Sequence, residues 1–192
     1  MNIILASGSP RRKELLTMIG ISEFTIIPDT SEEEVISGLT PEQIVCEIAL
    51  VKAKNVSQFC SKDDIIIAAD TLVFLDGEAI AKPEDEVDAA AMLRKLSGRH
   101  HHVYTGIALL KNNEHTTDYE RTDVFFRDIT DDEISAYIKT GEPMDKAGAY
   151  GAQGKASIFV KRIEGDFFNV MGLPLCKLSI MLKNFCNYPI LK

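Results

Sequence analysis

The stretch DIIIAAD, Asp64 to Asp70, is an apolar run with a carboxylate at each end. A short run that is apolar at every position is typical of a strand buried on both faces of a sheet. Asp70 would then stand at a strand end, where open α/β sheets bind their ligands. A carboxylate there can bind a hard divalent cation or accept a proton from water, although capping the next turn is the simpler role.

The N-terminal residues predict a strand, a tight loop and a helix. The strand covers Ile3 to Leu5, and the helix has Ser9 as its N-cap, begins at Pro10 and closes at Gly20. The first turn of this helix then carries two arginines, at a helix end that is already positive, where each exposed cation costs about 0.3–1 kcal/mol. These cations become favourable once an anion such as phosphate binds there, whereas solvated arginines on a capped helix are the alternative.

The rest of the chain alternates between helical and strand patterns. Helices are expected over residues 40–57, 83–97, 130–141 and 173–185, strands over 23–28 and 157–165, and hairpin turns at residues 76–77 and 112–113. This order predicts an α/β fold, with a mixed central sheet, flanking helices and a second lobe.

Composition limits the classes of partner. The chain has 192 residues, of which 45% are hydrophobic, and its 29 acidic against 21 basic residues give a net charge of −8. We therefore expect no binding to nucleic acid or to anionic membranes. No apolar run approaches the ~20 residues that span a bilayer, and no signal-peptide pattern is present, so we expect a cytoplasmic protein. The four cysteines form no C-x-x-C pair and are expected to be free thiols.

Lysines and acidic residues offer further candidate ligands. Lys82 follows the first hairpin, and Lys52 lies on a predicted helix. Lysine is a flexible point charge suited to terminal phosphates, although any single lysine can simply be a surface residue. The acidic run at residues 32–34 follows a predicted strand, and one of its members could share a metal with Asp70; most such runs are solvated surface.

The loop EPMDKAGAYGAQG, residues 142–154, carries glycines at Gly148, Gly151 and Gly154. Glycine allows a close approach of the backbone to a ligand, and the amide of Gln153 has the paired donor and acceptor that can read a base edge. No phosphate-cradling fingerprint is present, so a purely structural loop is the alternative.

Three consecutive histidines, residues 100–102, suggest a metal site at first sight. Neighbouring side chains on a strand face opposite sides, so the three rings cannot converge on one ion. We expect them to begin a strand and to have no catalytic role.

Eight segments together resemble the Maf family of nucleoside triphosphate pyrophosphatases: ASGSPRR, KAK, AADT, KP, RKLSG, YTG, EPMDKAGAYGAQG and GDFFNVMGLPL. They run from Ala6 to about Leu175. The resemblance implies a single domain over residues 1–192, similar in fold to inosine triphosphate pyrophosphatases, with two lobes around a deep cleft and frequent homodimers. It also implies hydrolysis of a nucleoside triphosphate between the α and β phosphates, with a divalent cation such as Mg²⁺, Mn²⁺ or Co²⁺.

The resemblance also assigns roles to residues of this sequence. The catalytic group is Asp70, Glu33 and Lys82, with Asp70 and Glu33 also holding the metal. The groups around the triphosphate are Ser7, Arg12 and Lys52, together with Lys82. The markers of the dTTP/UTP subgroup are Arg11, Thr71 and Gln153, whereas the sister group that acts on 7-methyl-GTP usually has glutamine after its aspartate and glutamate where Gln153 stands.

Two functions remain open at this stage. The first is an enzyme that hydrolyses dTTP and UTP, with CTP and modified pyrimidine nucleotides as further candidate substrates. The second is a nucleotide-binding regulator of cell division or septum formation, with little or no turnover. The presence of Asp70, Glu33 and Lys82 favours the enzyme.

Overall fold

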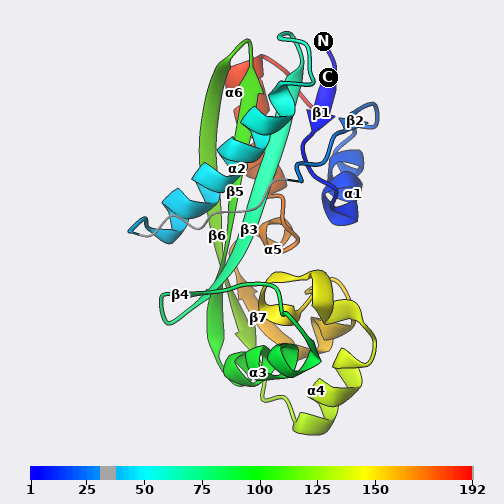
Figure 1. Ribbon diagram of the computed structural model, residues 1–192, viewed down its shortest axis with the longest axis vertical. Helices are drawn as coiled ribbons and strands as arrows, with labels where there is room; N and C mark the ends of the chain where they lie inside the picture. The colour runs from blue at the N-terminus through cyan, green and yellow to red at the C-terminus, as the bar shows by residue number, and fades with distance from the viewer. Residues whose placement is uncertain (31–37, 192) are drawn as a thin grey trace. The chain divides into compact units, whose positions relative to one another are not determined.

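The computed structural model describes residues 1–30 and 38–191. Within these residues, one sheet has the strand order β2-β1-β3-β5-β6-β7, and β4 pairs with β3 (Figure 1). The strands are β1 (Ile3–Leu5), β2 (Thr25–Ile26), β3 (Ile65–Leu75), β4 (Glu78–Ile80), β5 (His100–Lys111), β6 (Glu114–Phe126) and β7 (Val160–Glu164). β1 pairs in parallel with β2 and β3, whereas β3 with β4 and β6 with β7 are antiparallel. The expected α/β class with a mixed sheet is confirmed.

The α-helices other than α5 fall close to their predicted positions. They are α1 (Pro10–Met18), α2 (Pro41–Ser57), α3 (Glu86–Leu96), α4 (Asp131–Ile138), α5 (Phe167–Val170) and α6 (Leu175–Cys186), with three 3-10 helices, η1 (Glu142–Asp145), η2 (Ala147–Ala149) and η3 (Lys155–Phe159). A capping box forms at the start of α2, at Thr40, and at the start of α4, at Thr130. At each of them the threonine hydroxyl accepts a backbone N–H from the third residue of the helix.

The chain divides into two compact units. Unit 1 contains residues 1–70, 105–120 and 172–192, and unit 2 contains residues 71–104 and 121–171. Three strands, β3, β5 and β6, pass from one unit to the other. The unit boundary in β3 falls directly after Asp70, so the candidate residues are divided between the two units.

In unit 1, helix α2 covers one face of the sheet. Its buried residues Ala49, Leu50 and Ala53 pack with apolar side chains of β1, β3 and β5, and α6 lies on the other side of these strands (Figure 1). A Cβ on Gly106 of β5 would collide with the backbone carbonyl of Val45, so only glycine lets α2 come this close. The close packing fixes α2, and with it Lys52, relative to β3.

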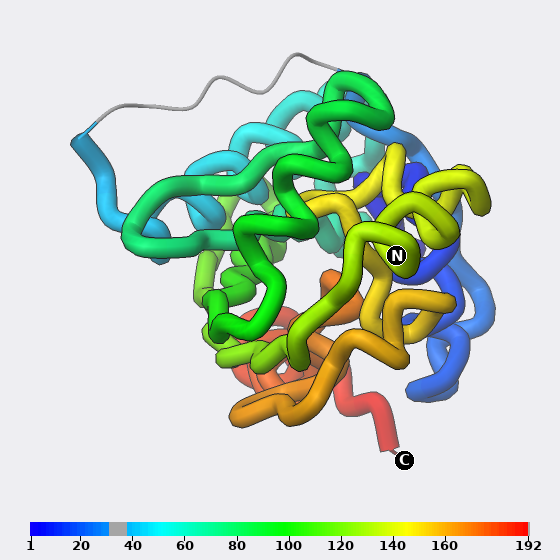
Figure 2. The backbone as a smooth tube through the Cα atoms, turned by 90° about the horizontal axis from the view of Figure 1, so that it is seen from below, coloured from blue at the N-terminus to red at the C-terminus, as the bar shows by residue number. Residues whose placement is uncertain are grey.

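In unit 2, helices α3 and α4 pack side by side and form the core with β3, β5 and β6 (Figure 2). The glycine-rich segment belongs to the same core, because Ala149, Tyr150 and Ala152 are buried in it. This segment is therefore a packed part of the unit rather than a loose connection.

Three expectations about the strands need correction. β2 covers only Thr25–Ile26 instead of residues 23–28, because its partner β1 has only three residues with which to pair. Residues 157–159 end the helix η3 instead of starting β7; only Phe159 of the three is buried. β3 continues five residues beyond Asp70, where its pairing moves to β4. The short helix α5 lies in a segment for which the sequence had suggested no element.

The four cysteines, Cys46, Cys60, Cys176 and Cys186, are free, as expected. Burial raises the pKa of the Cys46 thiol to about 11, and the charge of Asp118 adds to this effect. The described part of the chain contains no helix that is both long and apolar enough to cross a bilayer.

Candidate functional site

Asp70 is a buried carboxylate whose two oxygens differ in their hydrogen bonding. Its exposed fraction is 5%, and the Nζ of Lys52 donates to Oδ1 at 2.6 Å. The other oxygen, Oδ2, is buried and has no hydrogen-bond partner among residues 1–30 and 38–191. A buried acceptor without a donor costs free energy, about 1–3 kcal/mol or more for a charged group. Oδ2 is therefore available to a cation, a water molecule or another donor.

The start of helix α1 has no side-chain cap. Ser9 occupies the N-cap position with extended backbone, as expected, but its hydroxyl makes no capping bond, so the expected serine cap is wrong. The hydroxyl of Ser7 instead accepts the N–H of Ser9, at 3.3 Å. The first turn contains no acidic residue and carries Arg11 and Arg12. This helix start therefore keeps the positive character that suits an anion.

Two hydrogen bonds hold the guanidinium of Arg12. Its Nε donates to the carbonyl oxygen of Gly172 at 2.8 Å, and its Nη1 donates to the Oγ of Ser7 at 3.0 Å. The structure thus brings the predicted residues Ser7 and Arg12 together. The role of Gly172 was missed, because it lies 160 residues from Arg12 and no local pattern marks it.

Two pairs of unit 1, Ser7 with Arg12 and Lys52 with Asp70, belong to the region where the parallel pairing of β1 with β3 ends. β1 and β3 are parallel, with Leu5 level with Ile67, so Ser7 and Asp70 both come just after the paired residues. Carboxyl ends of neighbouring parallel strands are where α/β sheets bind ligands. The sequence-based grouping of these four residues is therefore consistent with the geometry of unit 1.

The remaining predicted residues are divided between the two units, apart from one that lies outside the described residues. Thr71 is half-buried on β3, Lys82 is exposed after β4, and Gln153 is exposed between η2 and η3. All three belong to unit 2, whereas Arg11 is half-buried on α1 of unit 1. Glu33 lies outside the described residues, so its predicted role stays a prediction.

The glycine-rich segment is attached to the residue that precedes Lys82. The N–H of Gly148 donates to the carbonyl oxygen of Ala81 at 3.0 Å, and a Cβ on Gly148 would lie 3.2 Å from the side chain of Val73. Gly148 has a φ of 70°, which favours glycine. The segment that carries Gln153 is thus fixed to the neighbours of Lys82 and Thr71.

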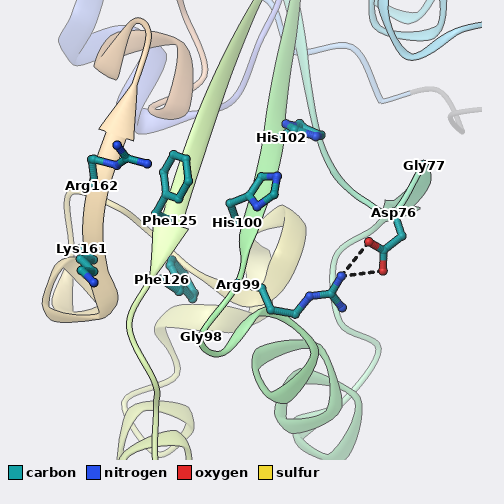
Figure 3. Close-up of a pocket in the computed structure, with 10 residues that line it drawn as sticks. All are labelled: Asp76, Gly77, Gly98, Arg99, His100, His102, Phe125, Phe126, Lys161 and Arg162. Atoms are coloured by element: carbon teal, nitrogen blue, oxygen red, sulfur yellow. Dashed lines mark hydrogen bonds and ion pairs between the residues drawn. The ribbon is translucent and has the colours of Figure 1, made fainter.

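The three histidines behave as the strand pattern predicted. His101 is buried, and its Nε2 lies 2.7 Å from the hydroxyl oxygen of Tyr150. Burial, reinforced by the two neighbouring histidines, lowers the pKa of His101 to about 3, so this ring is neutral at pH 7. His100 and His102 point to the other face, where they line a pocket of about 770 Å³ (Figure 3).

None of the predicted site residues that the structure describes lines that pocket. Its arginines are already paired: Arg99 donates to both oxygens of Asp76, and Arg162 pairs with Glu164 at 2.6 Å. Arg162 also lies over the ring of Phe125, 4.0 Å from its centroid (Figure 3). Because these cations are compensated within the protein, the pocket offers less attraction to an anion than its composition suggests.

A divalent cation fits the chemistry of Asp70. The described residues contain no group of three or more histidine, cysteine or carboxylate side chains that could enclose a metal ion. Mg²⁺ does not need such a cage, because it is commonly held by one or two carboxylates, water and substrate phosphates. The buried Oδ2 of Asp70, which has no hydrogen-bond partner in the described part of the chain, is the kind of hard oxygen ligand that Mg²⁺ takes.

Comparison with known proteins gives a family match over almost the whole chain. The model of the Maf-like protein family matches residues 2–185. The chain is 49% identical to a dTTP/UTP pyrophosphatase of Bacillus cereus (strain ZK / E33L) and 48% identical to one of Bacillus anthracis, over 95% of each chain. Among solved structures, a nucleoside-triphosphatase, or dITP/XTP pyrophosphatase, of Mycobacterium abscessus is 20% identical and matches 67% of this chain and 76% of its own, with a TM-score of 0.42. This last likeness is too weak to bear on function.

Proposed function

Because this chain belongs to the family of Maf-like proteins, we propose that it hydrolyses dTTP and UTP to the nucleoside monophosphate and pyrophosphate. The observation that carries the proposal is the identity of 48–49%, over 95% of both chains, with proteins named dTTP/UTP pyrophosphatase. The buried Asp70, one oxygen of which has no partner among the residues that the structure describes, supports the proposal independently, since it provides a group able to accept a proton. CTP and modified pyrimidine nucleotides are further candidate substrates.

We assign the binding of the triphosphate to the cationic groups of unit 1. The uncapped start of α1 and the guanidinium of Arg12 present positive charge, and Ser7 holds that guanidinium in place. Lys52, whose ammonium group pairs with Asp70, is assigned to the same phosphates by the family resemblance. The negative charges of a nucleoside triphosphate would compensate these groups, which gives a reason for an arginine at a helix start that is already positive.

The hydrolytic step uses Asp70 as the base. The oxygen of a water molecule forms a bond to the α phosphorus, and the bond from that phosphorus to the oxygen that bridges the α and β phosphates breaks. Pyrophosphate leaves with the electron pair of the broken bond, and the proton of the water passes to Oδ2 of Asp70. Lys52 holds Oδ1 of the same carboxylate, which orients Oδ2 for this transfer.

A divalent cation, Mg²⁺, Mn²⁺ or Co²⁺, would be held by Asp70 and, by the family resemblance, by Glu33. Bound there, it would neutralise charge that develops on the leaving pyrophosphate. Lys82 would act on the same phosphates as a point charge, and its position after β4, beside the anchored glycine-rich segment, supports this role.

Recognition of the pyrimidine base is assigned to Arg11, Thr71 and Gln153. The side-chain amide of Gln153 is exposed and offers one donor and one acceptor, which matches the paired groups on the edge of a uracil or thymine ring. We propose in addition that the protein is a cytoplasmic homodimer that binds neither nucleic acid nor membranes; its net charge of −8 supports the last two points.

The test is a panel of nucleoside triphosphates, each incubated with the protein and Mg²⁺, Mn²⁺ or Co²⁺ and assayed for pyrophosphate. We expect dTTP and UTP to give pyrophosphate and monophosphate in equal amounts, and purine nucleotides to react more slowly. Release of orthophosphate instead would contradict cleavage between the α and β phosphates. Nucleotide binding without any release would favour the septum-formation regulator.

A further inference from the structure

Glu142, the first residue of the glycine-rich segment, accepts hydrogen bonds from residues on both sides of that segment. Glu142 begins η1, and its Oε1 accepts the hydroxyl of Tyr137, at the end of α4, at 3.0 Å. Its Oε2 accepts the backbone N–H of Lys155 at 3.0 Å. One carboxylate therefore connects α4 with a backbone position 13 residues beyond Glu142.

The hydroxyl of Tyr137 makes a second connection to the same segment. It accepts the N–H of Gly151 at 3.3 Å, while it donates to Glu142. Tyr137 is buried, and its ring packs edge-on against Phe159, 5.4 Å between centroids. The Tyr137–Glu142 pair thus holds the chain at Gly151 and at Lys155, on either side of Gln153.

The glycines of the segment make room for these contacts. A Cβ on Gly154 would collide with the carboxylate of Glu142, and a Cβ on Gly151 would lie 2.9 Å from Cε of Lys146. Gly154 has a φ of −102°, which other residues adopt, so space rather than backbone conformation requires glycine there. The backbone on both sides of Gln153 is therefore packed against the side chains that hold it.

We propose that the Tyr137–Glu142 pair is a positioning device for pyrimidine selectivity, which fixes the backbone around Gln153 so that its amide meets the base at one place. This inference rests on the proposed function, in which Gln153 reads the base. Glu142 and Tyr137 would act through Gln153, so they are positioning residues rather than catalytic ones. Selectivity by hydrogen bonding needs such fixed geometry, because a misplaced amide pairs with several bases equally poorly.

The main experiment compares Glu142→Ala, Glu142→Gln and Tyr137→Phe with the wild type, using dTTP, UTP, ATP and GTP. For Glu142→Ala we expect the ratio of kcat/KM for dTTP to that for ATP to fall about tenfold, mainly through KM for dTTP. Glu142→Gln should recover most of this ratio, since an amide oxygen can still accept the N–H of Lys155. Tyr137→Phe keeps the packed ring and removes only the hydroxyl, so it tests the device in a variant that folds if the alanine variant does not.

A double-mutant cycle separates positioning from a general structural effect. In a Gln153→Ala background, Glu142→Ala should leave the dTTP/ATP ratio unchanged, because the amide that it positions is already gone. The matched control is Glu133→Ala, which removes a hydrogen-bonded carboxylate from the same helix α4, where it pairs with Arg127. We expect that control to leave the ratio unchanged.

Amide hydrogen exchange provides a readout that needs no substrate. In Tyr137→Phe the N–H of Gly151 should exchange faster than in the wild type, and in Glu142→Ala the N–H of Lys155 as well. The inference is overturned if Glu142→Ala changes the ratio equally with and without Gln153, if Glu133→Ala changes it to the same extent, or if Tyr137→Phe leaves exchange and selectivity unaltered. If the wild type hydrolyses no nucleoside triphosphate, the proposed function fails instead, and the exchange result still decides whether the pair holds the segment.

Discussion

Asp70 in unit 1 and Glu142 in unit 2 are two carboxylates placed in opposite situations. Asp70 has one oxygen bound to Lys52 and one buried oxygen without a donor in the described part of the chain. Glu142 has both oxygens occupied, one by Tyr137 and one by the N–H of Lys155. An acceptor that is already satisfied stabilises the fold, whereas a buried one that is not retains its capacity for a ligand. The contrast supports the proposed catalytic role of Asp70 and a structural role for Glu142.

The surroundings of the two carboxylates differ in the same way. Asp70 lies on β3 just beyond its parallel pairing with β1, in the unit whose helix α1 carries two arginines in its first turn and has no capping bond from Ser9. Glu142 stands among backbone N–H groups and glycines of one packed segment. Removal of Asp70 should therefore affect the rate of reaction far more than it affects the fold.

The largest effect is expected for Asp70→Asn. The amide cannot accept the proton of the attacking water, so kcat for dTTP should fall by about 10³-fold or more, while the affinity for dTTP is largely kept. The isosteric amide oxygen can still accept from Lys52, so unfolding in urea should show a loss of only about 1–2 kcal/mol. Steady-state kinetics, with nucleotide binding measured by calorimetry, checks both points.

A suitable control for Asp70→Asn is Asp76→Asn, which alters an aspartate in the turn after β3. The Asp76 side chain is 68% exposed and lies 2.6 Å from Arg99, which makes the two a surface ion pair. The control should leave kcat within about twofold, because surface ion pairs contribute little. Wild-type turnover in Asp70→Asn would show that the reaction does not need the Asp70 carboxylate. The two carboxylates would then not differ in function as proposed.

A smaller effect is expected for Gln153→Glu, which tests whether the segment held by Glu142 serves selectivity. The carboxylate loses the donor that the amide offers to the base, so the dTTP/ATP ratio of kcat/KM should fall about tenfold, with little change in kcat for dTTP. Competition assays with mixed nucleotides measure this ratio directly.

Ser157→Glu is the matched control, because it adds the same charge at another exposed position nearby, in η3. It should leave the ratio unchanged. An unaltered substrate ranking in Gln153→Glu would show that other residues recognise the base. Glu142 would then have no role in selectivity through Gln153.

The sequence predicted unit 1 better than unit 2, for a physical reason. Local patterns predicted the strand β1, the loop after it and the start of helix α1, which together contain Ser7 and Arg12, but they ended β3 at Asp70, five residues too early. The bond from Arg12 to Gly172 and the pair of Lys52 with Asp70 join distant segments, and only the folded chain shows them.

In unit 2 the glycine spacing marked the segment as unusual but did not explain it. Glu142 gave no local signal, because its partner Lys155 lies 13 residues away and the space it needs is made by Gly154. Ser9 also stands at the N-cap of α1 without a capping bond from its hydroxyl, and nothing in the structure explains this difference from the prediction.

The smallest effect on activity is expected at His101, which tests whether an unpartnered buried atom by itself marks chemistry. Its Nδ1 is buried without a hydrogen-bond partner among the described residues, like Oδ2 of Asp70, but the ring lies in the apolar core against Phe126 and Tyr150. We expect His101→Gln to keep kcat for dTTP within about twofold at pH 7, and to cost about 1 kcal/mol of stability.

The distinctive signature of His101 is the pH dependence of unfolding. Its pKa is lowered from 6.5 to about 3, chiefly by burial, so between these values the unfolded chain binds a proton that the folded chain does not. The contribution of His101 to stability is therefore fully present above about pH 6.5 and is lost as the pH falls, by up to about 1.4 kcal/mol per pH unit. Glutamine does not titrate, so the stability advantage of the wild type over His101→Gln, measured by urea unfolding at pH 7, 6 and 5, should shrink on acidification. A constant difference would show that His101 is protonated in the fold, and a loss of activity as large as that of Asp70→Asn would mean that the two unpartnered atoms have the same role.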